Sequence, residues 1–166
     1  PFLADLLALL KDSIQGLDVK EKLKKNLLKK IENLEKKIEK KKEKNSKQLG
    51  KLQKKVDKKA MKGKIDSGDA KIILQLLEEL EMQSEELMFD SGILTQLKET
   101  IANLDAKQNL KNNLLRRVEK LENTQALIRT LARLSAKITK KGEKGDIDDA
   151  SVEELVELID KIEEMI

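Results

Sequence analysis

The chemistry most visible in this sequence is that of closely spaced lysines. Between Lys20 and Lys64 the chain carries 20 lysines and six acidic residues, although the formal charge of the whole chain is only +4. Ammonium groups at this density attract phosphate and sulfate groups, because bound polyanions release their condensed counterions. The residues that we predict to contact a polyanion are Lys36, Lys37, Lys40, Lys41, Lys42, Lys44, Lys54, Lys55, Lys58, Lys59, Lys62 and Lys64.

Several polyanions fit this pattern, among them nucleic acid, a cell-wall polymer and a sulfated glycan. Specific nucleic-acid recognition is not expected, because Phe2 and Phe89 are the only aromatic residues and the chain has only four arginines. The alternative interpretation is that the lysines form the hydrated face of a helix that packs elsewhere. Both interpretations remain open at the level of sequence.

Catalysis and cofactor binding have little support in the composition. The chain has no His and no Cys, so it lacks the usual ligands of zinc, haem and iron–sulfur clusters and has no thiol nucleophile. The paired acids Glu78–Glu79 and Glu153–Glu154 fall where helices need a polar face. A calcium loop around Gly63 would place Lys58 and Lys62 at early ligand positions, where carboxylates are required. We therefore expect no enzyme activity, no metal and no cofactor.

One long stretch of the sequence occurs twice. The segment LDVKEKLKKNLLKKIENLEKK, from Leu17, returns as LDAKQNLKNNLLRRVEKLENT, from Leu104, at a shift of 87 positions. After a five-residue deletion the shift becomes 82, and GKIDSGDAKIILQLLEELE from Gly63 matches GDIDDASVEELVELIDKIE from Gly145. A repeat of this length indicates the duplication of a whole folding unit.

Each repeat contains four stretches with helical periodicity. In the second stretch, Leu27, Ile31 and Leu34 follow one another at spacings of four and three, which places them on one face of a helix. We predict that Asp18 and Asp105 cap the second helices. Third helices are predicted to begin at Ser46 and Asn123, and Gly63 and Gly145 to separate them from the fourth. The fourth helices are predicted to open at Ser67 or Asp66 and within Asp148 to Ser151.

These stretches predict an all-α fold made of two tandem four-helix bundles. The first bundle would span residues 1–83, with Lys-rich second and third helices, and the second would span residues 84–166. The connector between them would run from about Met82 to Gly92. Each helix exposes an apolar stripe, and four such stripes can close a small core.

The repeat resembles a four-helix accessory module, the FIMAH type, found in large secreted and surface proteins of bacteria and archaea. The resemblance rests on the second helix LDVKEKLKKNLLKKIENLEK, the GKID break and the acidic last helix, and it covers nearly the whole chain twice. The third helix SKQLGKLQKKVDKKAMKG departs from the family in being far more basic. The resemblance implies a helical module without known catalytic activity, used for spacing or contact.

We therefore expect a non-catalytic spacer or interaction module of a larger secreted or cell-surface protein. A polyanion-binding module acting through the Lys-rich region 36–64 is the alternative. The expected partner is a protein or a cell-surface polymer, and no oligomeric state is predicted. The opening PFLADLLALL is too short to cross a bilayer and lacks the marks of an intact signal peptide. An extracellular or surface location is expected, and a cytoplasmic one stays open.

Overall fold

The computed structural model describes residues 2–83, 87 and 89–166, and every regular element in these residues is a helix. The prediction of an all-α chain is confirmed. The elements, in chain order, are α1 (Leu3–Gln15), α2 (Glu21–Met61), α3 (Ser67–Met82), α4 (Ser91–Ala102), α5 (Gln108–Glu122), α6 (Gln125–Glu143) and α7 (Asp149–Glu164).

The helices form two compact units that do not follow the predicted boundaries. Unit 1 consists of Pro1–Glu39 and Thr124–Ile166, and unit 2 consists of Lys40–Asn123. Unit 1 thus contains α1, the first part of α2, α6 and α7, whereas unit 2 contains the rest of α2, α3, α4 and α5. The predicted division into 1–83 and 84–166 differs from this one, because each unit combines helices from both sequence repeats.

The continuity of α2 is the local reason for this division. Ser46 was predicted to begin a third helix, but it lies inside α2, so that prediction is wrong. Between Lys36 and Gln48 the sequence is mostly Lys, Glu and Gln, without Gly or Pro, and these residues favour an uninterrupted helix. In the second repeat, by contrast, Asn123 has an extended backbone with ψ of 105° and separates α5 from α6.

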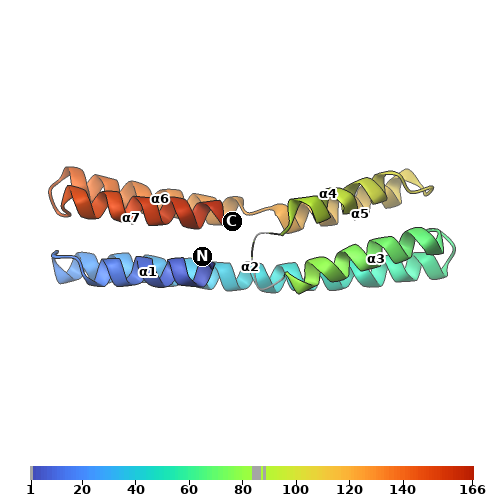
Figure 1. Ribbon diagram of the computed structural model, residues 1–166, viewed down its shortest axis with the longest axis horizontal. Helices are drawn as coiled ribbons and strands as arrows, with labels where there is room; N and C mark the ends of the chain where they lie inside the picture. Colours follow the sequence, from blue (N-terminus) through green and yellow to red (C-terminus); the bar gives the residue numbers. More distant parts are fainter. Residues whose placement is uncertain (1, 84–86, 88) are drawn as a thin grey trace. The chain divides into compact units, whose positions relative to one another are not determined.

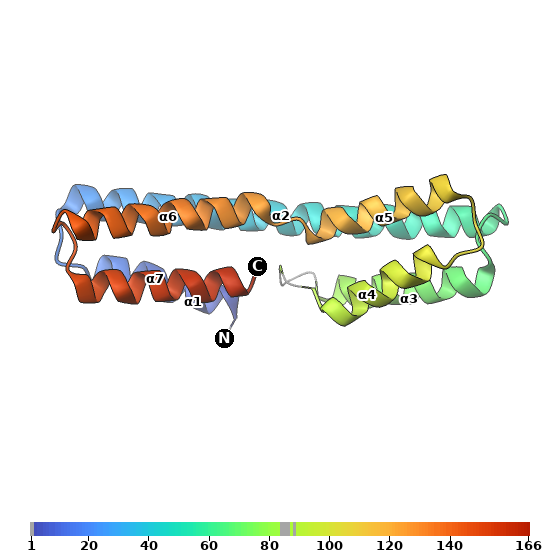
Figure 2. The ribbon, with the colours of Figure 1, turned by 90° about the horizontal axis from the view of Figure 1, so that it is seen from above.

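In unit 1, α7 packs against both α1 and α6 (Figures 1 and 2). All four helices of the unit contribute to its core. The buried apolar side chains include Leu6, Leu10, Ile14, Leu27, Ile31, Leu34, Leu131, Ile138, Leu155 and Ile159. Each such side chain contributes about 1.5–3 kcal/mol when it leaves water.

Unit 2 repeats this arrangement with other helices. Helix α4 packs against both α3 and α5 (Figures 1 and 2). The core contains Leu49, Leu52, Val56, Ile73, Leu77, Leu97, Ile101, Leu114 and Val118. Phe89, from the predicted connector, is also buried in this core, whereas residues 84–86 and 88 of that connector lie outside the described residues.

The turns before α3 and α7 have the same construction. Gly63 and Gly145 have φ values of 73° and 78°, a left-handed conformation that glycine adopts without strain. The backbone N–H of Lys64 donates to the Lys59 carbonyl at 2.9 Å, and the N–H of Asp146 donates to the Lys141 carbonyl at 2.9 Å. These bonds close the preceding helix in the pattern typical of a glycine C-cap. The predicted glycine breaks are confirmed.

The caps of the helices were predicted with mixed success. The Asp66 carboxylate accepts from the backbone of Gly68 and Asp69, so it caps α3 as predicted. Helix α5 begins after Lys107, and no side chain hydrogen-bonds at that N-cap. The predicted cap Asp105 lies two residues earlier, and Asp18 has the same place before α2, so both predictions are wrong.

Candidate anion-binding site

Each unit has a pocket where two of its interhelical turns meet, and the two pockets are made from equivalent positions of the repeats. The unit 2 pocket, of about 570 Å³, is lined by Lys55, Lys59, Lys64, Asp105, Ala106, Lys107, Asn109, Leu110 and Asn113. The unit 1 pocket, of about 650 Å³, is lined by Asp18, Val19, Lys20, Lys22, Leu23, Asn26, Lys137, Lys141, Gly145 and Asp146.

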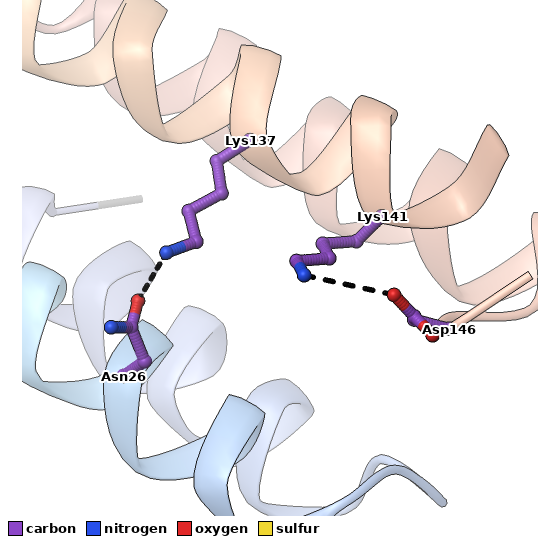
Figure 3. Close-up of polar contacts among 4 residues, drawn as sticks. All are labelled: Asn26, Lys137, Lys141 and Asp146. Carbon is purple, nitrogen blue, oxygen red and sulfur yellow. Dashed lines mark hydrogen bonds and ion pairs between the residues drawn. The ribbon is translucent and has the colours of Figure 1, made fainter. Parts of the chain in front are cut away.

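Each pocket contains a hydrogen bond between a lysine and an asparagine. In unit 1 the Lys137 Nζ donates to the Asn26 Oδ1 at 2.5 Å (Figure 3). In unit 2 the Lys55 Nζ donates to the Asn113 Oδ1 at 2.6 Å. Lys137 and Lys55 are related by the shift of 82, and Asn113 and Asn26 by the shift of 87. The same contact is therefore made twice, and each time it joins one sequence repeat to the other.

Matched contacts also hold neighbouring helices together within each repeat. The Lys24 Nζ donates to the Gln15 carbonyl at 2.9 Å, and the Lys111 Nζ donates to the Ala102 carbonyl at 3.3 Å. An ammonium group satisfies an end-of-helix carbonyl in both places, where the helix dipole favours positive charge. Two surface ion pairs correspond in the same way, Lys11 with Glu35 and Lys98 with Glu122.

The pockets differ most at one position of the glycine turn. In unit 1 the Lys141 Nζ lies 3.7 Å from the Asp146 Oδ2, so this ammonium has a carboxylate partner (Figure 3). In unit 2 the equivalent residues are Lys59 and Lys64. Where unit 1 has a carboxylate, unit 2 has a second ammonium group, so the formal charge at this position differs by two units.

The electrostatics of the unit 2 pocket reflect this crowding. The Lys64 ammonium lowers the pKa of Lys59, with smaller effects from desolvation and from the charges of Lys62 and Lys55. Desolvation lowers the pKa of Lys55, and the Arg117 guanidinium adds to this effect. The pocket thus concentrates positive charge that an anion would neutralise.

The twelve predicted lysines have different surroundings. Lys55, Lys59 and Lys64 line the unit 2 pocket. Lys37 donates to the Thr130 hydroxyl at 2.9 Å in unit 1. Lys41 is half-buried and donates to the Lys120 carbonyl at 2.9 Å, and its pKa is lowered by desolvation and by Lys44.

The other predicted lysines are mostly exposed, and none of them lines the unit 1 or the unit 2 pocket. They are Lys36, Lys40, Lys44, Lys54, Lys58 and Lys62, together with the half-buried Lys42. Exposed ammonium groups act on a polyanion mainly through the field that they share.

Lys107 and Asn113 are among the residues of the unit 2 pocket that were not predicted. They come from the second repeat, far along the sequence from the Lys-rich region. The repeat alignment contains a signal that could have revealed Asn113, because Asn26 and Asn113 occupy equivalent positions within otherwise lysine-rich or arginine-rich helices. Arg117, whose Nε donates to the Asn113 Oδ1 at 3.1 Å, orients this amide.

Two other features, a cluster of metal ligands and a membrane-spanning helix, are absent from the described part of the chain. No group of three or more acidic side chains there could hold a metal ion. Across residues 2–83, 87 and 89–166, no helix has both the length and the apolar character needed to cross a membrane.

Comparison with known proteins does not assign the chain to a family. No family model matches the chain. No curated protein and no solved structure matches it either. The resemblance to the FIMAH-type module stays a prediction.

Proposed function

We propose that the chain is a non-catalytic helical module of a larger secreted or cell-surface protein and that its unit 2 binds polyanions. One observation carries the binding function: Lys59 and Lys64 line a single pocket, at positions where unit 1 has the ion pair Lys141–Asp146. Repulsion between like charges is relieved when an anion enters between them. The pocket is therefore better suited to bind an anion than to stabilise the fold.

The distribution of charge between the units supports this function. Unit 2 contains 19 basic and 14 acidic residues, whereas unit 1 contains 16 basic and 17 acidic residues. An excess of positive charge on one unit raises the local concentration of a polyanion and speeds its association. We infer that unit 2 binds the polymer and that unit 1 contributes little to the affinity.

We also propose that the two units descend from one duplicated ancestor whose helix pairs are now exchanged. Two tandem bundles, each made from one repeat, would pair Asn26 with Lys55 and Asn113 with Lys137. The observed contacts are the crossed ones, Asn26 with Lys137 and Asn113 with Lys55. Exchange of equivalent elements is an economical route to a paired fold, because each helix keeps the contacts it would make in its own bundle.

A salt titration of the full chain tests the binding function. We expect the chain to bind heparin, DNA or polyphosphate at low ionic strength, with an affinity that falls steeply as salt is added. The variant Lys54→Gln/Lys58→Gln removes two exposed charges from unit 2, and Lys25→Gln/Lys29→Gln removes two at the same spacing from unit 1. The unit 2 variant should reduce the slope of log affinity against log salt by up to about 2, because each phosphate contact contributes about 0.9.

The matched unit 1 variant should leave that slope nearly unchanged. If both variants reduce it equally, the polymer does not distinguish the units, and the assignment to unit 2 is wrong. If the wild-type chain retains none of the three polymers at low ionic strength, the binding function is wrong as a whole.

A spacer function is the second candidate, and the use of the apolar stripes favours it. Leucine and isoleucine side chains of every helix are buried in the two cores, which leaves surfaces that are mainly polar. Such a module can separate or position other domains without a ligand. The full-length precursor tests this candidate: a leader peptide and large neighbouring domains would support it, and a stand-alone cytosolic gene would contradict it.

A further inference from the structure

The two pockets share a framework, so the residues that differ between them indicate the ligand. Framework positions are kept: a lysine donates to an asparagine in each, and Lys107 corresponds to Lys20. Asp105 and Asp18 also correspond, so one carboxylate is common to both pockets. The differences in charge are Lys64 in place of Asp146, which adds positive charge in unit 2, and Asn109 in place of Lys22, which removes one charge there.

These two changes act at different places. Lys64 lies beside Lys59 and lowers its pKa, so the added charge is close to another ammonium group. Lys22 lies in the first turn of α2 and is exposed, as Lys64 is, so solvent and salt screen both charges. The difference is that Lys64 takes the place of the carboxylate partner that Lys141 has in unit 1. The balance therefore favours an anion in unit 2, between the ammonium groups of Lys59 and Lys64.

The chemistry of the lining narrows the class of anion. No aromatic ring lines the unit 2 pocket, and its apolar residues are Ala106 and Leu110, so there is no platform on which a base could stack. Its basic residues are lysines, which act as compact point charges, whereas planar carboxylates are best matched by the fork of arginine. A tetrahedral group with oxygens in several directions fits separate ammonium groups well.

We propose that the unit 2 pocket binds one phosphate group of a linear phosphate polymer that lacks bases, with Lys55, Lys59, Lys64 and Lys107 as its cationic partners. This inference rests on the proposed polyanion-binding function and names its ligand class. The exposed Lys62, at the end of the Lys-rich region, would contact a neighbouring phosphate of the same chain. The unit 1 pocket does not bind phosphate in this way, because Asp146 neutralises Lys141.

A pair of substitutions at the one differing turn position tests the pocket. Lys64→Asp gives unit 2 the residue of unit 1, and the glycine turn tolerates it because Asp146 occupies an identical turn. The control Lys58→Asp makes the same change of charge at an exposed position outside the pocket. With inorganic polyphosphate as the probe, isothermal titration should show a loss of affinity of about tenfold for Lys64→Asp and about twofold for Lys58→Asp.

The reciprocal substitution Asp146→Lys should create a second site. Short-chain tripolyphosphate should then bind with twice the stoichiometry, and the backbone amide signals of Asn26 and Lys141 should shift along with those of Asn113 and Lys59. Thermal unfolding of each variant checks that the fold is intact. Equal losses for Lys64→Asp and Lys58→Asp, in folded variants, would overturn the pocket.

The outcomes separate this inference from the function on which it rests. If the chain binds polyphosphate and the two aspartate variants lose affinity equally, the polyanion-binding function is supported and the proposed pocket is wrong. Stronger binding of heparin or double-stranded DNA than of polyphosphate at the same salt concentration contradicts the base-free phosphate polymer. Absence of binding to any of these polymers at low ionic strength contradicts both proposals together.

Discussion

Unit 1 and unit 2 are two versions of one arrangement, and they differ where a ligand could enter. Their helices correspond, their glycine turns have the same hydrogen bonds, and a lysine donates to an asparagine at the same place in each. At one turn position, however, unit 1 has Asp146 and unit 2 has Lys64. The conserved contacts orient helices, whereas the changed residue alters charge without touching a core.

If the two units descend from one duplicated ancestor, as we propose, this difference indicates which positions of the fold can change most easily. A core position is constrained by packing, because adding or removing even one methylene group disturbs the close packing of the neighbouring side chains. A residue that follows a left-handed glycine has its backbone bonds fixed while its side chain stays exposed. Such a position can change the sign of its charge at little structural cost. The turn is therefore where the two units could diverge most readily.

The largest expected effect concerns whether the helices of one sequence repeat pack against those of the other repeat. The chain has no cysteine, so engineered pairs can be cross-linked without background. In Asn26→Cys/Lys137→Cys, a short bismaleimide should join the two thiols nearly completely, because these residues are in contact. In Asn26→Cys/Lys55→Cys, the same reagent should give almost none, because both residues lie on the continuous helix α2, many turns apart.

Gel mobility and mass spectrometry of the intact chain measure both reactions. The second pair is the matched control, since it differs only in which lysine is replaced. Efficient cross-linking of Asn26→Cys/Lys55→Cys, together with failure of Asn26→Cys/Lys137→Cys, would restore the tandem arrangement and refute the exchange.

The pairing of the helices is the part of the fold that sequence reasoning did not obtain. The helices themselves, the glycine turns and the cap Asp66 follow from local patterns, since each depends on a few neighbouring residues. Exchanged and tandem arrangements bury the same stripes against equivalent partners, so hydrophobic periodicity does not distinguish them. The distinction depends on whether one short segment, around Ser46, bends or stays helical. Its lysines and glutamates favour the helix, and a single serine does not overcome them.

The candidate site was predicted in part for the same reason. Lys55, Lys59 and Lys64 belong to the Lys-rich region and were among the twelve predicted residues. Sequence reasoning gave them no more weight than the exposed Lys36, because charge density alone does not show which ammonium groups line a pocket. Lys107 could be found only after the two repeats were known to meet.

The next largest effect concerns a buried polar residue of unit 2. Asn45 is 2% exposed, and within the described part of the chain its Nδ2 has no hydrogen-bond partner. At the equivalent position of the second repeat the residue is Leu127. We expect Asn45→Leu to raise the free energy of unfolding by about 1–2 kcal/mol, because it removes a buried, unsatisfied donor.

Urea denaturation followed by circular dichroism measures this gain. The converse substitution Leu127→Asn should lower stability, which controls for a general effect of side-chain size. A loss of stability in Asn45→Leu would mean that the asparagine fixes the register of α2 and that the apolar side chain is misplaced there.

A smaller effect is expected where two helices of unit 1 approach closely. A Cβ added at Gly142 would lie 2.6 Å from Val152 Cγ2, so Gly142→Ala should force the two helices apart. The equivalent residues in unit 2 are Ala60 and Ala70, so unit 2 has two side chains of equal size where unit 1 has a glycine and a valine. Overpacking costs about 1–3 kcal/mol and the better helix propensity of alanine offsets up to about 1, so we expect a net loss of about 1 kcal/mol.

The double variant Gly142→Ala/Val152→Ala tests the cause of that loss. It gives unit 1 the pair found in unit 2, and thermal unfolding should show that much of the stability lost in Gly142→Ala returns. If the double variant loses more stability than the two single variants lose together, close packing between α6 and α7 is not the cause of the loss in Gly142→Ala.

The smallest predicted effect is a shift in one titration within the unit 2 pocket. Lys64 is the main cause that lowers the pKa of Lys59, so Lys64→Met should raise that pKa toward its ordinary value. Lys58→Met removes an equal charge that is not among the causes, and it should leave the titration nearly unchanged. Nuclear magnetic resonance of the lysine side chains measures both.

The sign of this shift also determines how stability depends on pH. Because its pKa is lowered in the folded chain, Lys59 binds fewer protons there than in the unfolded chain between that lowered value and 10.5. Stability should therefore rise with pH through this window, and Lys64→Met should weaken the rise. Bound phosphate favours the charged ammonium, so polyphosphate should raise the pKa of Lys59. Polyphosphate should be released as the pH approaches this raised pKa. An unchanged Lys59 titration in the presence of saturating polyphosphate would place the phosphate away from this pair of lysines.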